Sequence, residues 1–318
     1  MNAVILGYGV VGKGIEILTN SLEDINIKYV YVRKEKENLP YFSNNEDMVI
    51  QDDIDIVFEC LNGLEPANTL IQKALKKGKH VISSNKAVVA TYLDTYLELE
   101  EEYGGSIQVE ACVAGGIPFI DALLKLKRLE PLQGYEGIFN GTSNYILDSM
   151  QKNNLDFEDV LKEAQDKGYA EKDPSNDIDG VDVYYKTKIS NSLAFNTPIV
   201  DIPYYAGIRT IKMLDIKFIK MNNKVIRHLS ISRQIDDKII SIIAPCCMDE
   251  NDFLANVPSN YNAQKILSHS FDTLGYYGQG AGQLPTAQAM VQNALDTLEN
   301  KERKIVYAGF FPEGGKSH

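Results

Sequence analysis

The segment from residue 164 to residue 186 concentrates the side chains that are best suited to chemistry. It places five acids within twelve residues and then opens a predicted helix; the acids are Glu171, Asp173, Asp177, Asp179 and Asp182. Asp182 and Lys186 are four positions apart, so both project from one face of that helix. In hydride transfer to a carbonyl, such a lysine protonates or polarises the oxygen while the carboxylate orients it. The other acids could bind a substrate ammonium group, but a capped helix start with a surface ion pair explains the same residues equally well.

A glycine pattern near the start of the chain predicts a second site. Gly7, Gly9 and Gly12 form GxGxxG directly after a short apolar strand and at the head of a helix. The first glycine permits a tight turn, the second lets backbone approach a pyrophosphate, and the third allows close packing of helix on strand. Val10 and Val11 begin the helix whose amides and dipole would bind the phosphates. The strand–turn–helix context favours dinucleotide binding over a plain glycine-rich turn.

The end of the second strand bears on which dinucleotide is used. NAD-selective loops place an acid about 20 residues beyond the glycine turn to bind the ribose hydroxyls. Here the strand ends in Val32-Arg33-Lys34, and two cations at that place favour the 2′-phosphate of NADP over NAD. A basic strand end in solvent remains an alternative, since Glu35 and Glu37 follow at once.

The elements that would position these residues alternate between strand and helix over the first third of the chain. The expected strands cover residues 3–6, 27–32, 54–60, 79–83 and 106–113. The expected helices between them cover residues 12–20, 66–77 and 91–103. This alternation predicts βαβ units and a doubly wound, Rossmann-type parallel sheet, so the fold class is α/β.

The pattern changes from about Gly134 onward. A strand over 135–139 leads to two helical stretches joined by the acidic loop, then to β-rich segments such as 238–244, and finally to a helix over 282–300. We therefore expect a dinucleotide-binding domain over 1–128 that the C-terminal segment 282–318 completes. An inserted α+β domain over 129–281 would provide substrate binding, catalysis and dimerisation.

Composition excludes several classes of function. A formal net charge of -12 argues against nucleic acid and against an anionic membrane surface, because both need clustered cations. No apolar run approaches the roughly 18 residues of a spanning helix, and the N-terminus lacks the basic region of a signal peptide. The four cysteines have neither disulfide nor zinc spacing. We expect a cytoplasmic protein with reduced thiols and a small-molecule substrate.

The acidic segment closely resembles the signature of homoserine dehydrogenases. That pattern runs Ala-x3-Gly-aromatic, a spacer, then Asp-Pro-x2-Asp-apolar-x-Gly-x-Asp-x3-Lys. The matching positions are Ala164, Gly168, Tyr169, Asp173, Pro174, Asp177, Ile178, Gly180, Asp182 and Lys186. Further blocks agree in order, namely PANTLIQKALKKGKHVISSNKA, EACVAGGIP, GIFNGTSNYIL and GQGAGQLPTA. The resemblance covers roughly residues 1 to 300.

The resemblance implies specific roles. Lys186 would be the catalytic proton donor or acceptor, with Asp182 beside it in the substrate pocket. Lys86 would be a second lysine near substrate and nicotinamide. Glu171 would bind the substrate's ammonium group, and Asp177 would support that pocket. The implied reaction interconverts L-homoserine and L-aspartate 4-semialdehyde, on the route to threonine and methionine.

Cofactor, cation and partner expectations follow from the same resemblance. NADP, or less favourably NAD, would be bound with the help of Ser83, Ser84, Lys86, Gly168 and Gly280. Family members also bind a monovalent cation, Na⁺ or K⁺, and the matching positions are Glu110, Val113, Gly115 and Ile117. Carbonyl and carboxylate oxygens suit a hard cation better than a transition metal. A homodimer is implied.

Two departures from the pattern keep alternatives open. Many relatives have two consecutive acids where this chain has Asn176-Asp177. A paralogous dehydrogenase acting on another small amino or hydroxy aldehyde is therefore one alternative. A non-catalytic cofactor-binding sensor is another, although intact Lys86, Asp182 and Lys186 argue against it. The length also leaves no room for the regulatory ACT-type domain or fused aspartate kinase of longer relatives.

Overall fold

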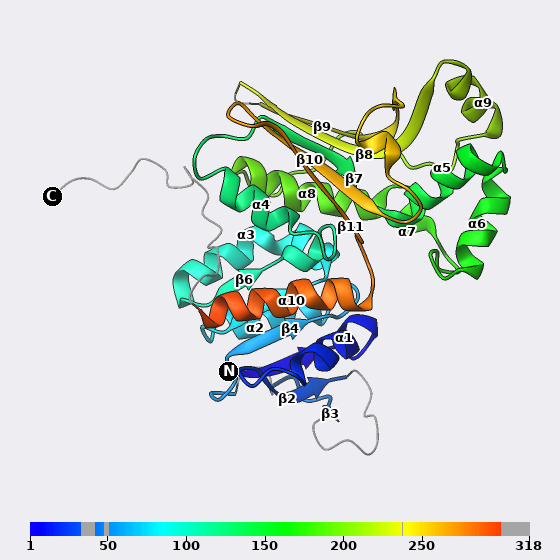
Figure 1. Cartoon of the computed structure of the whole chain (residues 1–318). Coiled ribbons are helices and arrows are strands. Elements are labelled where there is room, and N and C mark those ends of the chain that lie inside the picture. Colours follow the sequence, from blue (N-terminus) through cyan, green and yellow to red (C-terminus); the bar gives the residue numbers. More distant parts are fainter. Residues whose placement is uncertain (33–41, 48–50, 237, 300–318) are drawn as a thin grey trace.

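The first of two sheets is parallel and has the strand order expected for dinucleotide binding. The computed structural model describes residues 1–32, 42–47, 51–236 and 238–299 (Figure 1). The strands are β1 (Asn2–Leu6), β2 (Asn26–Tyr31), β3 (Phe42–Ser43), β4 (Ile56–Glu59), β5 (His80–Ser83) and β6 (Ser106–Gln108), in the order β3-β2-β1-β4-β5-β6. The order reverses between β1 and β4, which is where a doubly wound sheet binds its ligand.

Helices cover both faces of this sheet because its strands are apolar on both sides. Ala3 and Ile5 face α1 (Val10–Thr19) and α10 (Gln283–Leu298), whereas Val4 and Leu6 face α2 (Ala67–Leu75) and α3 (Lys86–Tyr103). The C-terminal helix α10 thus returns to the first sheet and packs against α1. None of the helices in the described ranges is long and apolar enough to cross a membrane.

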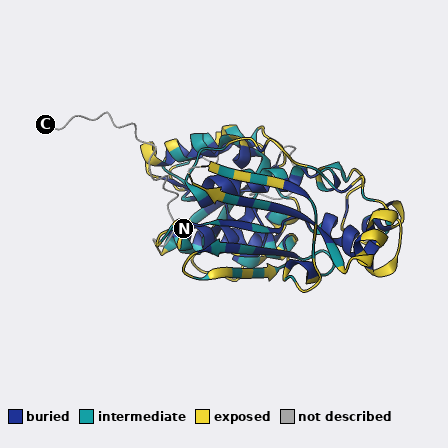
Figure 2. Ribbon diagram, turned by 90° about the horizontal axis from the view of Figure 1, so that it is seen from above, coloured by how far each residue is buried: buried dark blue, intermediate teal, exposed yellow. Residues whose placement is uncertain are grey.

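The second sheet is antiparallel and lies entirely between residues 134 and 278. Its order is β11-β10-β7-β8-β9, formed by β7 (Gly134–Ile138), β8 (Lys224–Ile235), β9 (Lys238–Asp249), β10 (Asn262–Ser268) and β11 (Asp272–Gly278). Helices α4 (Phe119–Leu126) and α8 (Val181–Phe195) lie between it and the first sheet (Figure 1). Its central strands are mostly buried. Along the edge strands β9 and β11, exposed residues alternate with less exposed ones (Figure 2).

Four short helices form an outer lobe beyond the second sheet. They are α5 (Gly141–Asn153), α6 (Phe157–Asp166), α7 (Ser175–Ile178) and α9 (Met213–Met221). Their apolar side chains make a separate small core. By contrast, one large core runs from α2 and α3 through α4 and α8 to the second sheet, so the two sheets share buried apolar side chains.

The expected α/β class and parallel sheet are confirmed, and the β-rich segments form the antiparallel sheet, but several element boundaries are corrected. The strand expected over 106–113 ends at Gln108, and Glu110–Cys112 is a 3₁₀ helix, because the Glu110 carboxylate turns inward to the amides of Ile120 and Asp121. Helix α3 begins at Lys86, five residues before the expected start, because Asn85 caps it. Helix α10 ends at Leu298, and residues 300–318 lie outside the described residues.

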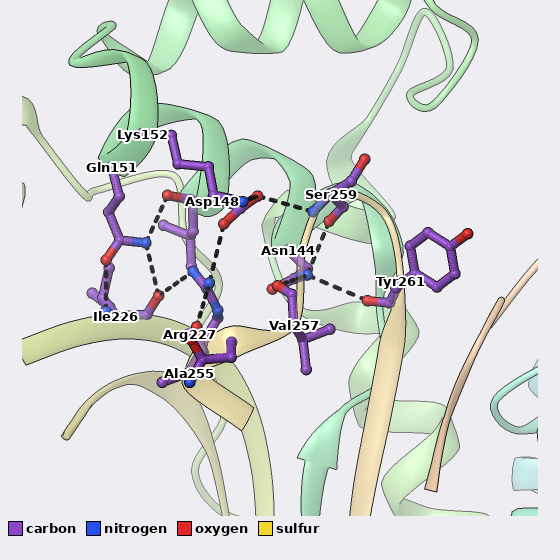
Figure 3. A network of polar contacts seen from close by, with 12 residues as sticks. Asn144, Asp148, Gln151, Lys152, Ile226, Arg227, Ala255, Val257, Ser259 and Tyr261 are labelled. Carbon is purple, nitrogen blue, oxygen red and sulfur yellow. Dashed lines mark hydrogen bonds and ion pairs between the residues drawn. The ribbon is translucent and has the colours of Figure 1, made fainter. Parts of the chain in front are cut away.

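A buried ion pair joins the outer lobe to the second sheet (Figure 3). The Arg227 guanidinium of β8 lies 3.1 Å from the Asp148 carboxylate of α5, and both side chains are almost fully buried. Arg227 also donates to the Ala255 carbonyl at 2.6 Å, and Asp148 accepts from the Ser259 amide at 2.9 Å. Both charges therefore have further hydrogen bonds, which a buried pair requires.

We expect Arg227→Met to lower the free energy of unfolding by about 3–5 kcal/mol, because Asp148 would be left without its buried partner. Lys152 is the matched control, since it contacts the same carboxylate from an exposed position. Lys152→Met should cost no more than about 1 kcal/mol. Urea unfolding of the three proteins measures this, and equal costs for the two variants would contradict the assignment.

Candidate active site

Two lysines from different helices meet on one carboxylate. Lys186 Nζ lies 2.9 Å from Asp182 Oδ2 on the same helix α8, which confirms the predicted pair. Lys86 Nζ, at the start of α3, lies 2.7 Å from the other oxygen, Asp182 Oδ1. Lys86 is 96 positions before Asp182 in the sequence, so the packing of α3 on α8 is what brings it to the pair on α8.

Burial and charge fix the ionisation of this cluster. The Asp182 side chain is 4% exposed and Lys186 10%, whereas Lys86 is 40% exposed. Burial alone would raise the pKa of Asp182, but Lys186 and Lys86 outweigh it and hold that pKa below its usual range. Asp182 in turn raises the pKa of Lys86, although burial opposes the shift. Lys86 and Asp182 therefore remain charged near neutral pH.

Lys186 keeps one donor free for a further partner. Its ammonium group has three N–H bonds. One is directed to Asp182 and another to the Phe139 carbonyl at 2.6 Å. Among the described residues no hydrogen bond takes up the third N–H, so this donor is available to a substrate oxygen, as proton transfer to a carbonyl requires.

Asn140 is a site residue that sequence reasoning missed. Its Nδ2 donates to Asp177 Oδ1 at 2.7 Å and to Asp182 Oδ2 at 2.9 Å, so one amide bridges the two carboxylates. Its Oδ1 accepts from the Ser143 amide at 2.7 Å and caps α5. The segment GIFNGTSNYIL gave a signal, since an Asn before Gly-Thr-Ser is a good helix cap. The second use of its side chain depends on tertiary contacts.

The remaining acids of the 164–186 segment divide into two groups. Asp177 lies in the site, and burial together with Asp182 raises its pKa above the ordinary value. Asp173 accepts from Ser175, and Asp179 forms a two-pronged ion pair with Arg209, so both are used at the surface. In the described part of the chain, no hydrogen bond or ion pair joins the Glu171 carboxylate to the lysine cluster.

The glycine turn has the geometry that its spacing predicts. Gly7 has φ +95°, and a Cβ there would lie 2.9 Å from the Cys60 carbonyl at the end of β4. A Cβ on Gly12 would lie 2.1 Å from the Gly7 carbonyl, so the helix and strand approach closely. Gly9 faces open space, and Val10 beside it is 64% exposed while Val11 is half-buried. A phosphate group fits this open helix start.

The other predicted cofactor residues differ in what they present. The Ser83 hydroxyl is buried and donates to Glu59 at 2.6 Å, and the Ser84 amide donates to the Glu59 carbonyl at 3.0 Å. Gly168 ends α6 with φ +74° on the surface. Gly280 lies in a turn against Gly115, where a Cβ on Gly115 would meet the Gly280 carbonyl at 2.6 Å. Arg33 and Lys34 lie outside the described residues.

A cavity of about 100 Å³ borders two of the four predicted cation residues, Glu110 and Ile117, whereas Val113 and Gly115 do not line it. Glu110, Gly116, Ile117 and Asp121 form one side and α10 the other, where Asn293 Oδ1 is buried without a partner among the described residues. Burial and Asp121 raise the pKa of Glu110 to about 8, although hydrogen bonds from the amides of Asp121, Ile120 and Phe119 lower it. In the turn that follows Glu110, Ala114 has a φ of 59°, which is costly for a residue with a side chain, whereas Gly115 adopts its φ of 56° freely.

Comparison with known families agrees with the resemblance seen in the sequence. The model of the homoserine dehydrogenase NAD-binding domain matches residues 7–110. The homoserine dehydrogenase model matches residues 118–295, which include Asn140, Asp177, Asp182 and Lys186. The first model covers the parallel sheet except β1, and the second covers the antiparallel sheet.

Individual relatives match nearly the whole chain. The homoserine dehydrogenase of Neisseria gonorrhoeae is 35% identical over 312 residues, covering 93% of this chain and 72% of the relative. The crystal structure of a homoserine dehydrogenase from Thiobacillus denitrificans superimposes with a TM-score of 0.90 at 33% identity, covering 98% of this chain and 77% of that one. A hyperthermophilic archaeal homoserine dehydrogenase in complex with NADPH, at 22% identity and a TM-score of 0.82 over 95% of this chain and 99% of that one, shares the fold. The chain therefore belongs to the homoserine dehydrogenase family and is an NAD(P)-dependent oxidoreductase.

Proposed function

We propose that Lys186 exchanges the proton with the substrate oxygen in the interconversion of L-aspartate 4-semialdehyde and L-homoserine. The observation that carries this role is the free N–H of a lysine whose other two donors are fixed by Asp182 and Phe139. When bound, the nicotinamide exchanges the hydride with the carbon of the same group. In the biosynthetic direction, toward threonine and methionine, Lys186 protonates the alkoxide oxygen as charge develops there.

In this proposal Lys86 stabilises negative charge on the substrate, and Asp182 positions the two lysines. Lys86 stays protonated, because Asp182 raises its pKa, and its half-exposed ammonium group stabilises negative charge on the substrate oxygen. Asp182 holds both ammonium groups at 2.7–2.9 Å, so their separation is set before substrate arrives. Preorganised charges of this kind need no rearrangement during the reaction.

Two further acids bind the amino acid part of the substrate. Asp177 is held toward the cluster by Asn140 and offers its second oxygen to an ammonium group. Glu171 lies on an exposed loop. Two residues earlier in the chain, the Tyr169 carbonyl accepts a hydrogen bond of 2.5 Å from the Thr142 hydroxyl of α5. Closure of this loop over the substrate would bring the Glu171 carboxylate to the same ammonium group. The substrate is then held at one end while its aldehyde faces Lys186.

We expect Lys186→Met to lower kcat by ~10²–10⁴-fold, the usual cost of losing a general acid, while cofactor Kd stays nearly unchanged. Lys188 is the matched control, because it is on the same helix but pairs with Asp201 at 2.8 Å. Lys188→Met should retain kcat within about threefold, as a residue outside the reacting cluster. Steady-state assays with homoserine measure both, and wild-type kcat in Lys186→Met would remove the assigned role.

NADP is the proposed preferred cofactor, with NAD used less well. The glycine turn fits a pyrophosphate, because Gly9 leaves open space at the start of α1. Strand β2 lies directly beside β1, and in this fold the segment after such a second strand binds the adenosine ribose. In the sequence this segment contains Arg33 and Lys34, and the planar guanidinium of arginine matches phosphate oxygens.

Arg33→Ala should reduce kcat/KM for NADP by ~10–100-fold, corresponding to one or two charge-assisted hydrogen bonds, and leave NAD nearly unaffected. Lys28→Ala is the control, since Lys28 is a basic residue of β2 that pairs with Asp53 at the surface. Lys28→Ala should change neither the kcat/KM for NADP nor the kcat/KM for NAD. A wild-type preference for NAD, or equal impairment with both cofactors, contradicts the assignment.

The cavity beside Glu110 is proposed to hold a monovalent cation, Na⁺ or K⁺. Glu110, the Ile117 carbonyl and Asn293 Oδ1 at the cavity would supply hard oxygen ligands. The resemblance adds the carbonyls of Val113 and Gly115 from the neighbouring turn. The cation would neutralise a buried carboxylate and brace the turn on which Gly280 packs. Its role is structural, at the base of the proposed cofactor turn.

In K⁺ or Na⁺, the Tm should therefore exceed the Tm in N-methyl-D-glucamine chloride of equal ionic strength by a few degrees, about 2–4 °C per kcal/mol of binding free energy. Glu110→Gln should abolish the difference. Glu130→Gln, which changes a surface carboxylate bonded to Ser270, should preserve it. Equal wild-type Tm values in all three salts would refute the cation site.

The homodimer implied by the resemblance would use the open face of the second sheet. Ile235, Ile240 and Ile242 are 53%, 55% and 38% exposed there. Ile243 points the other way into the core shared with α8, so Ile240 and Ile242 share the opposite face. A second copy placed on this face would bury those side chains.

A further inference from the structure

Glu59 stands where the strand order of the parallel sheet reverses. As the last residue of β4, it pairs with Leu6 of β1 on one side and with Ser83 of β5 on the other. A dinucleotide crosses this sheet in the crevice at the carboxyl ends of the strands. Glu59 is completely buried, so it lies beneath that crevice and does not line it.

The Glu59 carboxylate accepts hydrogen bonds from the segment that follows β4 and from the end of β5 and the residues after it. Oε1 accepts from the Leu61 amide at 2.8 Å and, at a longer 3.5 Å, from Asn85 Nδ2. Oε2 accepts from the Ser83 hydroxyl at 2.6 Å. These partners are neutral donors, so the ionised form of Glu59 is matched by hydrogen bonds and not by a cation.

The same bonds reach the first residue of α3. The Ser83 hydroxyl accepts from the Asn85 amide at 3.1 Å while it donates to Glu59. Asn85 then caps α3 by accepting from the Val88 amide at 3.3 Å. The next residue is Lys86, whose ammonium group lies on Asp182. Three short steps therefore connect a buried carboxylate under the cofactor crevice to a cation of the reacting cluster.

We infer that Glu59 is a positioning residue for the reaction, which sets the Ser83–Asn85 turn and thereby the place of Lys86 relative to Asp182. It does not touch substrate or cofactor. Its function is to fix the position of the start of α3, so that the Lys86 ammonium group contacts both Asp182 and the substrate oxygen. The inference rests on the role proposed above for Lys86.

The two acceptor oxygens of the Glu59 side chain, and not its volume alone, explain this arrangement. A carboxylate accepts on both oxygens, whereas a glutamine at this position would direct an NH₂ group at Ser83 or at Leu61. The Ser83 hydroxyl would lose its acceptor, and the bond that fixes Asn85 would weaken with it. Burial raises the pKa of Glu59 to about 7 even though the bonds from Ser83, Leu61 and Asn85 lower it, so these donors offset only part of the cost of the buried charge.

The test compares Glu59→Gln, Ser83→Ala and Lys86→Met with a matched control. Glu100→Gln is that control, because Glu100 is a buried carboxylate at the other end of α3 that accepts from the Ile107 amide at 2.9 Å. We expect Glu59→Gln to lower kcat by ~10–100-fold, the range of one lost hydrogen bond to a charged group, with homoserine KM changed less than kcat. Ser83→Ala should lower kcat in the same direction, and it reports on the same link if Glu59→Gln fails to fold. Glu100→Gln should change the Tm to a similar extent but leave kcat within about twofold, as expected away from the chemistry.

The double variant Glu59→Gln/Lys86→Met decides whether Glu59 acts through Lys86. If it does, the double variant should be no more than about threefold slower than Lys86→Met alone, because residues of one network are not additive. Single losses that multiply in the double variant would overturn the inference and leave the role of Lys86 intact. Unchanged kcat in Lys86→Met would overturn that role and the inference with it. Unchanged kcat in Glu59→Gln, or an equal kcat loss in Glu100→Gln, would overturn the inference alone.

Discussion

The buried carboxylate of Asp182, shared by two ammonium groups, is the interaction on which the rest of the site depends. Taking an unpaired charge out of water is costly, so a buried carboxylate requires cations and hydrogen bonds at fixed positions. Lys186 lies on α8 together with Asp182, Lys86 lies on α3, and the amide of Asn140 lies at the start of α5. Three elements must therefore converge on one point, and the packing of the two sheets through α3 and α8 satisfies that requirement.

The sequence predicted local features and the general architecture well, because these depend on short-range patterns. The four-residue spacing of Asp182 and Lys186 predicts a helical pair, and the structure contains it. Alternating apolar strands and amphipathic helices predict a parallel sheet, and the glycine spacing predicts the turn at Gly7 to Gly12. Lys86 was assigned only through the family pattern, since nothing within its own segment indicates a carboxylate 96 positions away.

What the sequence could not predict depends on tertiary contacts or on competing uses of a side chain. Asn140 has the type and place of a helix cap, and its second contact with two carboxylates follows only when α7 and α8 pack against it. Ser83 was expected at the cofactor, but its hydroxyl faces inward because a buried Glu59 needs a donor there. A single acid at the end of an apolar strand was the available signal for Glu59, since carboxylates are almost never fully buried without partners.

The packing of α3 against α8 also explains which parts of the site are rigid. Its two helices are joined at their starts by Lys86 and Asp182, and again where the Asp94 carboxylate of α3 accepts from the Ile199 amide beyond α8 at 3.1–3.2 Å. Lys127 of α4 closes the C-terminal end of α8 by donating to the Leu193 carbonyl at 2.6 Å. Helices fixed at both ends hold catalytic groups more accurately than loops do. The lysine–carboxylate cluster therefore lies on these two fixed helices, whereas Glu171, which is proposed to bind the substrate ammonium group, is on an exposed loop.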